Sequence, residues 1–452
     1  MVTIDREPVI RVGLLTGARR VSFDLAGRFV NGDGATMPAG SYTARVERDT
    51  VKLEGAASLT AQSITLAPAN NDECQFTVRG VTIGIGFHWE REESQKFQGK
   101  LIIISEGDSL TVTNELPLEA YLASVISSEM SASSPSELLR AHAIVSRSWL
   151  LAPLIATNTA DAITKPLPSL ATADSEELIR WYGRESHRRF DVCADDHCQR
   201  YQGISKAFSQ SAFDAVRDTG GKLLMYGEEI CDTRYSKSCG GMTESYSSVW
   251  EDQDQPYLKP IYDGPGSEAP GHRMPLSVEA NAEDWITETP LAYCAMPSAE
   301  LLGSILPGFD QETRDFYRWR LEYSQDELAE ILHSRLGADF GGIHSLVPLE
   351  RGESGRIIRL KINGEKRTLV IGKELEIRRA LSRSHLYSSA FVVTSQAGSG
   401  SRYPSRFTLI GAGWGHGVGL CQIGAAVMAD RGHSHEEILA HYFQNTEVKK
   451  LY

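Results

Sequence analysis

The sequence predicts an α+β fold that is mostly antiparallel β, with a central helical segment and an inserted α+β subdomain. Residues 1–110 alternate short β-type runs with turn residues. Residues 117–149 repeat apolar side chains at helical spacing. Residues 276–395 combine a helical run with a hairpin pattern. A chain of 452 residues is long enough for two or three domains and can bury a large core without disulfides.

The N-terminal region, residues 1–110, is expected to form antiparallel strands. Its apolar and β-branched runs are separated by glycine, proline and asparagine, which favour turns. The clearest runs are residues 9–12, 81–85 and 101–104, and the clearest turns are residues 31–34 and 38–40.

The first part of the core, residues 111–275, begins with two predicted helices. Pro117 suits the first turn of one helix, whose apolar residues recur at helical spacing. Ser134 and Glu137 have the spacing of a capping box at the start of the next helix. Residues 127–130 are therefore predicted to form a short break between the helices.

Two further segments follow, an inserted subdomain at 276–395 and the C-terminal part of the core at 396–452. The subdomain has a helical run at 324–332 and a hairpin whose turn is the Asn-Gly pair at 363–364. The C-terminal part contains a glycine-rich loop, residues 411–419, and then a helical pattern to the last residue.

Charge and hydropathy exclude some partners. A formal net charge of −13 argues against nucleic acid and anionic membranes, which attract basic surfaces, and is compatible with a polysaccharide. The longest apolar run, residues 149–156, is far below the roughly 20 residues of a membrane span. Residues 1–14 lack the pattern of a secretory signal, so we expect a cytoplasmic protein or an export segment outside this chain.

Glu129 is the candidate acid/base. A carboxylate held between packed helices loses part of its water, and this loss favours the protonated form that a general acid needs. The alternative is an exposed glutamate at a helix end, which is the commoner situation for a glutamate taken at random.

The glycine-rich loop contains five glycines in nine residues. Such a loop is expected where the backbone adopts unusual dihedrals or approaches a ligand closely. Trp414 could stack on a sugar ring, and His416 could donate a hydrogen bond or a proton. The Gly-Lys-Ser/Thr ending of a phosphate-binding loop is absent. A tight turn packed on a helix is the alternative.

Seven scattered cysteines do not indicate a disulfide framework. Two of them, Cys193 and Cys198, lie near His187 and His197, and zinc prefers these ligand types. Because adjacent His197 and Cys198 rarely bind the same ion, His187, Cys193 and Cys198 are the predicted ligands. A local disulfide and free thiols are the alternatives. The other five cysteines are expected to be buried small hydrophobes.

Residues 235–244 carry small and hydroxyl side chains around a Gly-Gly turn and could line a polar groove. Ser238 or Cys239 would act as a nucleophile only with a base nearby. A strand followed by a turn explains the pattern equally well.

Four blocks, in this order, resemble the stage II sporulation protein D / LytB (SpoIID/LytB) family, and a closing segment also fits. The most specific feature is the Trp-Gly-His-Gly run of the glycine-rich loop together with the Ser-Glu-Met run at 128–130. The blocks and the closing segment are residues 116–130, 139–148, 235–250, 413–425 and 436–443. The resemblance covers roughly residues 95–452.

The resemblance implies a lytic transglycosylase that cuts peptidoglycan glycan strands and leaves 1,6-anhydro ends. Glu129 would protonate the glycosidic oxygen and then act as base on the C6 hydroxyl, without the second carboxylate of most hydrolases. A branch of the family binds zinc through residues placed like His187, Cys193 and Cys198. The residues that would position substrate or stabilise charge are Arg147, Tyr235, Ser238, Gly240, Gly241, Trp414, His416 and Gln422.

The resemblance also implies a location in the cell envelope and glycan strands as partners. LytB-like members suggest an alternative, a non-catalytic enhancer of a separate N-acetylmuramoyl-L-alanine amidase. A zinc hydrolase that uses the Cys/His residues is a third hypothesis. The chain departs from the family pattern at Ser236, where histidine is common, at His142, where glutamine is common, and in the length of its segment 276–395.

Overall fold

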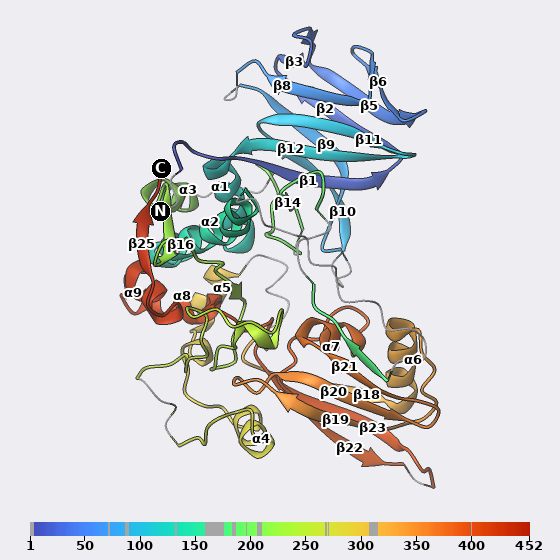
Figure 1. Cartoon of the computed structure of the whole chain (residues 1–452), viewed down its shortest axis with the longest axis vertical. Helices are drawn as coiled ribbons and strands as arrows, with labels where there is room; N and C mark the ends of the chain where they lie inside the picture. The colour runs from blue at the N-terminus through green and yellow to red at the C-terminus, as the bar shows by residue number, and fades with distance from the viewer. Residues whose placement is uncertain are drawn as a thin grey trace. The chain divides into compact units, whose positions relative to one another are not determined.

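The computed structural model shows two compact units within one chain. Unit 1 comprises residues 1–154, 184–223 and 449–452, and unit 2 comprises residues 155–183 and 224–448. Both consist of mostly antiparallel sheets with helices, which confirms the α+β fold class (Figure 1). The structure describes residues 4–70, 73–85, 90–131, 133–158, 176–182, 187–195, 197–205, 210–266, 269, 271–306, 315–398 and 400–452.

The N-terminal part of unit 1 is β-rich, as predicted. Its strands are β1 (Val9–Ala18), β2 (Arg20–Ala26), β3 (Phe29–Asn31), β4 (Thr36–Met37), β5 (Gly40–Glu47), β6 (Thr50–Gly55), β7 (Leu59–Ala61), β8 (Ser63–Pro68), β9 (Gln75–Ile83), β10 (Arg91–Phe97), β11 (Lys100–Glu106) and β12 (Ser109–Pro117). A short strand, β14 (Val192–Cys193), pairs in parallel with β1.

These strands form two sheets with a core between them. One sheet has the order β14-β1-β12-β11-β8-β3-β4, and the other has the order β10-β9-β2-β5-β6-β7. Strand β11 contacts β6, and β12 contacts β2 and β5, so the two sheets lie face to face. Alternate side chains of a strand point into this core, and in β1 these are Ile10, Val12 and Leu14.

The helices in the described part of unit 1 are α1 (Leu118–Glu129), α2 (Ser136–Asn158), whose residues 155–158 fall in unit 2, and α3 (Gln210–Asp218). Pro117 is the N-cap of α1, as expected for a proline at a helix start. Helix α1 contacts both α3 and β12. The sheets and these helices together position the residues around Glu129.

Two local predictions in this region are wrong. Residues 127–129 are the last turn of α1, and Met130 is its C-cap. Residues on both sides of the predicted break are buried. The helix continues through the break because tertiary packing stabilises a helical turn more than local propensity does. Among the described residues the Ser134 hydroxyl has no hydrogen-bond partner, and α2 begins at Ser136, so the expected capping box does not form. Glu137 pairs with Arg140 along the helix.

The remaining strands and helices lie in unit 2 or in the chain segments that cross between the two units. The strands are β13 (Glu177–Ile179), β15 (Lys222–Tyr226), β16 (Glu229–Ile230), β17 (Tyr235–Ser236), β18 (Arg318–Ser324), β19 (Ile343–Arg351), β20 (Ile357–Gly364), β21 (Thr368–Gly372), β22 (Phe391–Ala397), β23 (Pro404–Ala412), β24 (Leu420–Cys421) and β25 (Glu447–Lys450). The helices are α4 (Glu279–Thr287), α5 (Ala299–Ile305), α6 (Gln325–Leu336), α7 (Glu374–Ala380), α8 (Gln422–Asp430) and α9 (His435–Tyr442), with 3-10 turns η1 (Tyr246–Ser248) and η2 (Tyr293–Ala295).

Two sheets of unit 2 share one core. Their orders are β13-β21-β20-β19 and β18-β23-β22. Apolar residues of both sheets pack with Leu328 and Leu332 of α6 and with Ile377 of α7. The predicted helix at 324–332 is confirmed as α6, which has a capping box at Ser324 and ends at Gly337 in the left-handed region.

Two predictions for unit 2 need correction. The hairpin exists as β20 and β21, but Asn363 pairs with Thr368 and the strand continues through Gly364. The Asn363 amide donates to Ser345 Oγ on β19 at 2.8 Å, which keeps it within the sheet. The C-terminal helical pattern ends with α9, and β25 follows it. Pairing with a distant segment overrides the local pattern there.

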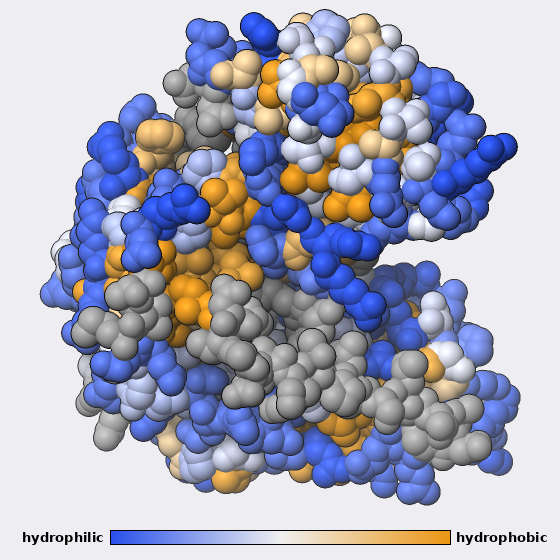
Figure 2. All heavy atoms as spheres, turned by 45° about the horizontal axis from the view of Figure 1, so that its top comes forward, coloured by the Kyte–Doolittle hydropathy of each residue, from blue (hydrophilic) through white to orange (hydrophobic). Residues whose placement is uncertain are grey.

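Hydrophilic residues make up much of the molecular face shown in Figure 2, and hydrophobic ones gather in smaller patches. This agrees with a composition in which 41% of the residues are hydrophobic and 23% are charged. No helix in the described ranges combines the length and the hydropathy needed to cross a membrane.

Candidate functional site

The predicted site residues are divided between the two units. Unit 1 contains Glu129, Arg147 and the Cys/His residues. Unit 2 contains residues 235–244, called the Ser/Gly block below, and the glycine-rich loop. The predicted residues therefore form one group in each unit.

Glu129 ends α1, and a backbone donor fixes its carboxylate. The residue is 9% exposed, and its neighbours Ser128 and Met130 are buried. Its Oε1 accepts a hydrogen bond from the Arg200 N–H at 3.0 Å. A carboxylate at the edge of the core with one oxygen held in this way has a defined direction, as proton transfer requires.

The segment that holds Glu129, residues 199–203, packs along α1. Tyr121 donates from its hydroxyl to Gln199 Oε1 at 3.1 Å, and Ser124 donates to the Gly203 carbonyl at 2.8 Å. Gly203 has a φ of 57°, and a Cβ at this position would collide with backbone of the neighbouring strand. The segment and the helix therefore form one tightly fitted structure.

The Cys/His cluster lies immediately before this segment and contains four residues rather than three. The ligand atoms of His187, Cys193, His197 and Cys198 all lie within 4.8 Å of one another. His197 Nδ1 is 3.5 Å from Cys198 Sγ and 3.8 Å from Cys193 Sγ, and His187 Nε2 is 3.1 Å from Cys198 Sγ. His197, which was not among the predicted ligands, directs its Nδ1 to the same point as the adjacent Cys198 Sγ.

The donor set of this cluster fits zinc. Two imidazoles and two thiols are a usual ligand set of a tetrahedral structural site. The hydrogen bond with Cys198 contributes most to lowering the pKa of the Cys193 thiol to about 2, His187 and His197 add to this effect, and burial opposes it. The thiolate form binds metal ions, so Cys193 is ready to act as a ligand at neutral pH. All seven cysteines are free thiols, which excludes the local disulfide in this structure.

Arg147 is committed to contacts inside unit 1. Its Nη2 and Nε donate to the two carboxylate oxygens of Glu119 at 2.6 and 3.0 Å, and its Nη1 donates to the Lys222 carbonyl at 3.0 Å. The side chain is fully buried. These contacts support a role in joining α1 to α2 more than direct contact with substrate.

The Ser/Gly block is buried as well. Ser238 is 0% exposed and Cys239 is 2% exposed, so neither side chain is accessible as a nucleophile in this conformation. The Ser238 N–H and C=O bond to the Trp414 backbone at 3.1 and 2.8 Å. The strand-and-turn interpretation therefore describes this block.

Both glycines of the block are required by the backbone. Gly240 and Gly241 have φ values of 80° and 101°. A Cβ on Gly240 would lie 2.9 Å from the backbone nitrogen of Gly413. The turn and the glycine-rich loop thus approach each other as closely as two backbones can. Tyr235 lies in β17, which pairs in parallel with β24 just beyond the loop.

The glycine-rich loop wraps around a buried arginine that the sequence did not indicate. Arg356 is 1% exposed and donates to the Gly415 carbonyl at 3.1 Å and to the Cys239 carbonyl at 3.1 Å. A Cβ on Gly417 would collide with its guanidinium. Four loop glycines have left-handed φ values of 76°, 93°, 76° and 73°, namely Gly413, Gly415, Gly417 and Gly419. This confirms the expectation of unusual dihedrals.

Trp414 and His416 are the partly exposed residues of the loop with functional side chains. Trp414 packs against Tyr387, with ring centroids 4.4 Å apart. His416 Nδ1 accepts the Val418 N–H at 3.0 Å, which leaves the proton on Nε2. Burial first, and then nearby arginine charges, lower the pKa of His416 well below its usual range. A neutral His416 would donate a hydrogen bond rather than supply a proton. The predicted Gln422 is 2% exposed at the start of α8.

An aromatic group beside His416 was not predicted. The Trp250 ring lies edge-on to His416 with centroids 5.0 Å apart, and Tyr246 lies 4.9 Å from Trp250. The Arg234 guanidinium stacks over Trp250 at 4.3 Å. Partly exposed aromatic rings beside hydrogen-bond donors are suited to bind sugar rings.

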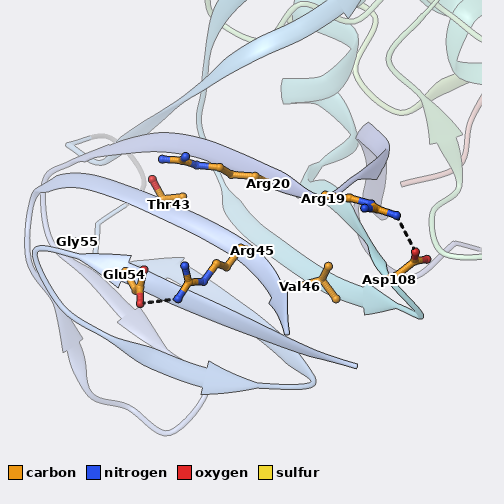
Figure 3. Close-up of a pocket in the computed structure, with 8 residues that line it drawn as sticks. All are labelled: Arg19, Arg20, Thr43, Arg45, Val46, Glu54, Gly55 and Asp108. Atoms are coloured by element: carbon orange, nitrogen blue, oxygen red, sulfur yellow. Dashed lines mark hydrogen bonds and ion pairs between the residues drawn. The ribbon is translucent and has the colours of Figure 1, made fainter. Parts of the chain in front are cut away.

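A separate pocket of about 730 Å³ lies among strands β2, β5 and β6 of unit 1 (Figure 3). Three arginines line it, Arg19, Arg20 and Arg45. Two acidic side chains compensate part of this charge, because Asp108 pairs with Arg19 and Glu54 pairs with Arg45. None of the predicted site residues lines this pocket.

Comparison with known families gives an assignment to the segment that contains Glu129. Residues 106–226 match the family model described as "Stage II sporulation protein". This segment is therefore similar to the stage II sporulation protein D (SpoIID) family. Residues 244–419 match a second model, described only as a domain of unknown function, DUF8618. The matched segment, residues 106–226, includes α1, the Cys/His cluster and Arg147, whereas the glycine-rich loop lies beyond it.

Individual relatives agree with this assignment. The chain is 22% identical to stage II sporulation protein D of Bacillus subtilis (strain 168) and 24% identical to that of Bacillus amyloliquefaciens, each over 336 residues, which are 74% of this chain and 75% of the relative. It is also 24% identical to the amidase enhancer of Bacillus subtilis (strain 168) over 262 residues, which are 55% of this chain and 34% of that protein.

Proposed function

We propose that the chain acts at the cell envelope as a lytic transglycosylase on peptidoglycan glycan strands. The observation that carries the proposal is the Glu129 carboxylate, held by the Arg200 N–H at the end of α1, within the segment that matches the SpoIID family model. The resemblance to the SpoIID/LytB family supports a glycan as the substrate. The acidic net charge is compatible with such a partner.

One carboxyl group serves both steps of this reaction. Protonated Glu129 donates its proton to the oxygen between N-acetylmuramic acid and N-acetylglucosamine, and the C1–O bond breaks. The resulting carboxylate takes the proton from the C6 hydroxyl, whose oxygen bonds to C1 and closes the 1,6-anhydro ring. No water is consumed, and Glu129 regains its proton. A second carboxylate, as in hydrolases, is not needed.

The Cys/His cluster would hold a zinc ion as a structural centre. Four protein ligands close a tetrahedral coordination sphere, whereas a catalytic zinc keeps a position open. This argues against the zinc hydrolase hypothesis. Cys198 directly precedes residues 199–203, so a bound ion would keep the Arg200 N–H against Glu129. The site residues of unit 2, in particular the partly exposed His416 and Trp414, would contact sugar rings.

The decisive experiment uses peptide-free glycan strands and mass spectrometry of the products. Wild-type protein should release fragments with 1,6-anhydro ends, and Glu129→Gln should lower the rate by about 100-fold or more, as expected for loss of a general acid. The amide oxygen of glutamine can still accept the Arg200 N–H, so the fold should remain. Glu47→Gln, which changes an exposed side chain at the end of β5 in unit 1, is the matched control and should retain full activity. Hydrolytic products, or equal activity of Glu129→Gln, would refute the proposal.

The relative named amidase enhancer favours a second candidate function. In that case the chain binds glycan without cutting it and stimulates a separate N-acetylmuramoyl-L-alanine amidase. Purified protein would then release no glycan fragments, and wild type and Glu129→Gln would stimulate the amidase equally.

A further inference from the structure

Unit 2 contains a second cluster of metal-ligand side chains, and it was not foreseen. Cys239, Asp263, Cys294 and Cys421 place their ligand atoms within 4.8 Å of one another. They come from four separate parts of the chain: the Ser/Gly turn, the segment before α4, η2 and the start of α8. The three cysteines are buried, as the sequence predicts for small hydrophobes, but they converge on a carboxylate that is 0% exposed. Apolar packing alone does not explain such a group.

The distance between two of the sulfur atoms suits a tetrahedral ion. A zinc–sulfur bond of about 2.3 Å places two sulfur ligands about 3.8 Å apart. Cys239 Sγ and Cys294 Sγ are 3.7 Å apart, and Cys239 Sγ is 3.0 Å from Asp263 Oδ2. A disulfide would require about 2.05 Å between the sulfurs, and these cysteines are free.

Backbone donors point at the sulfur atoms. The Cys239 N–H donates to Cys421 Sγ at 3.2 Å, and the Gly424 N–H donates to the same sulfur at 3.4 Å. The Gly241 N–H donates to Cys239 Sγ at 3.4 Å. Such donors stabilise negative charge on sulfur, which the thiolate ligands of a metal carry and neutral thiols do not.

The carboxylate is oriented by its own partners. Asp263 Oδ1 accepts the Tyr442 hydroxyl at 2.8 Å and lies 3.3 Å from His441 Nε2. Its other oxygen, Oδ2, faces the sulfurs. Donors that hold the outer oxygen of a ligating carboxylate are a regular feature of metal sites.

We propose that Cys239, Asp263, Cys294 and Cys421 bind a zinc ion as a structural centre of unit 2. The ion would join the Ser/Gly turn to the start of α8 and so fix both ends of the region that contains the glycine-rich loop. Three thiolates and one carboxylate around Zn²⁺ leave a net charge of −2, the same as in a site of four thiolates. The proposal concerns metal content alone and holds whether or not the chain cuts glycan.

Zinc content of the purified full-length chain tests the proposal. Two clusters predict about two zinc ions per wild-type chain and about one in the Cys193→Ser/Cys198→Ser variant. Adding Cys294→Ser should remove the second ion. Cys231→Ser alters another buried thiol of unit 2 outside both clusters and should keep two ions.

Cobalt substitution identifies the ligands. The Cys193→Ser/Cys198→Ser variant, loaded with Co²⁺, should show strong thiolate-to-cobalt charge-transfer absorption that Cys294→Ser abolishes. If Cys294→Ser fails to fold, two measurements still test the proposal. They are the number of zinc ions per wild-type chain and the cobalt spectrum of the Cys193→Ser/Cys198→Ser variant. A single zinc per wild-type chain that is lost with Cys193 and Cys198, or a disulfide between Cys239 and Cys294 in non-reducing peptide maps, would overturn the proposal.

Discussion

The ion pair between Arg147 and Glu119 allows a direct test of whether Arg147 is structural. The guanidinium is fully buried, whereas the Glu119 side chain is 24% exposed. Glu119 also accepts the Tyr452 hydroxyl at 2.5 Å and the Gly221 N–H at 3.3 Å. Replacing Glu119 with glutamine keeps the shape and one acceptor oxygen but removes the charge that compensates Arg147.

The expected loss of stability follows from that burial. Breaking a buried ion pair by removing one partner costs about 3–5 kcal/mol. Because Glu119 is partly solvated and glutamine keeps one hydrogen bond, we expect the free energy of unfolding of unit 1 to fall by about 2–3 kcal/mol. Asp108→Asn breaks the exposed pair with Arg19 and should cost less than about 0.5 kcal/mol.

Hydrogen–deuterium exchange of peptides from α1 and α2 measures this effect within unit 1 alone. Protected amides should exchange about 30- to 150-fold faster in Glu119→Gln than in wild type, and at the wild-type rate in Asp108→Asn. If both variants exchange like wild type while glycan binding is lost in Glu119→Gln, the pair acts on substrate and our structural interpretation of Arg147 is refuted.

Three further perturbations have defined outcomes. Gly417→Ala places a Cβ against Arg356 at a φ of 76° and should destabilise unit 2 by about 2–3 kcal/mol in thermal denaturation, whereas Gly432→Ala, with a φ of 90° and open space, should cost about 1 kcal/mol. Burial lowers the pKa of His385 to about 3, so between this value and about 6.5 the unfolded chain binds the extra proton and stability falls as the pH drops. His385→Asn should reduce the loss in urea stability between pH 7.5 and 5.0 by about 1 kcal/mol, and an unchanged loss would contradict this. Removal of metal by a chelator should speed exchange at the Arg200 amide and slow glycan cleavage together, and cleavage that continues unchanged would separate the Cys/His cluster from Glu129.

In unit 2, some residues that were predicted to contact substrate are buried. Ser238 and Gln422 were predicted to contact substrate, yet they are buried and belong to the framework under the glycine-rich loop. The partly exposed groups are Trp414, His416 and the neighbouring Trp250. Substitutions at the buried positions should therefore affect stability before they affect glycan binding.

Local sequence patterns determined the elements whose cause is local. The alternation in β1 and the proline before α1 predicted strand and helix correctly, because side-chain periodicity and proline geometry act within a few residues. The four left-handed glycines of the loop were foreseen for the same reason. The cluster at 187–198 was also visible, since its ligands lie close together in the chain.

Only the tertiary structure decided which distant groups meet. Two such contacts join residues more than twenty positions apart in the chain, and no local pattern encodes them. One places Arg356 inside the glycine-rich loop, and the other brings Cys239, Cys294 and Cys421 together at Asp263. The Ser134 cap and the Asn-Gly turn failed because packing and strand pairing contribute more free energy than a single cap or turn preference. The sequence by itself determined the fold class, and packing decided which buried polar groups meet.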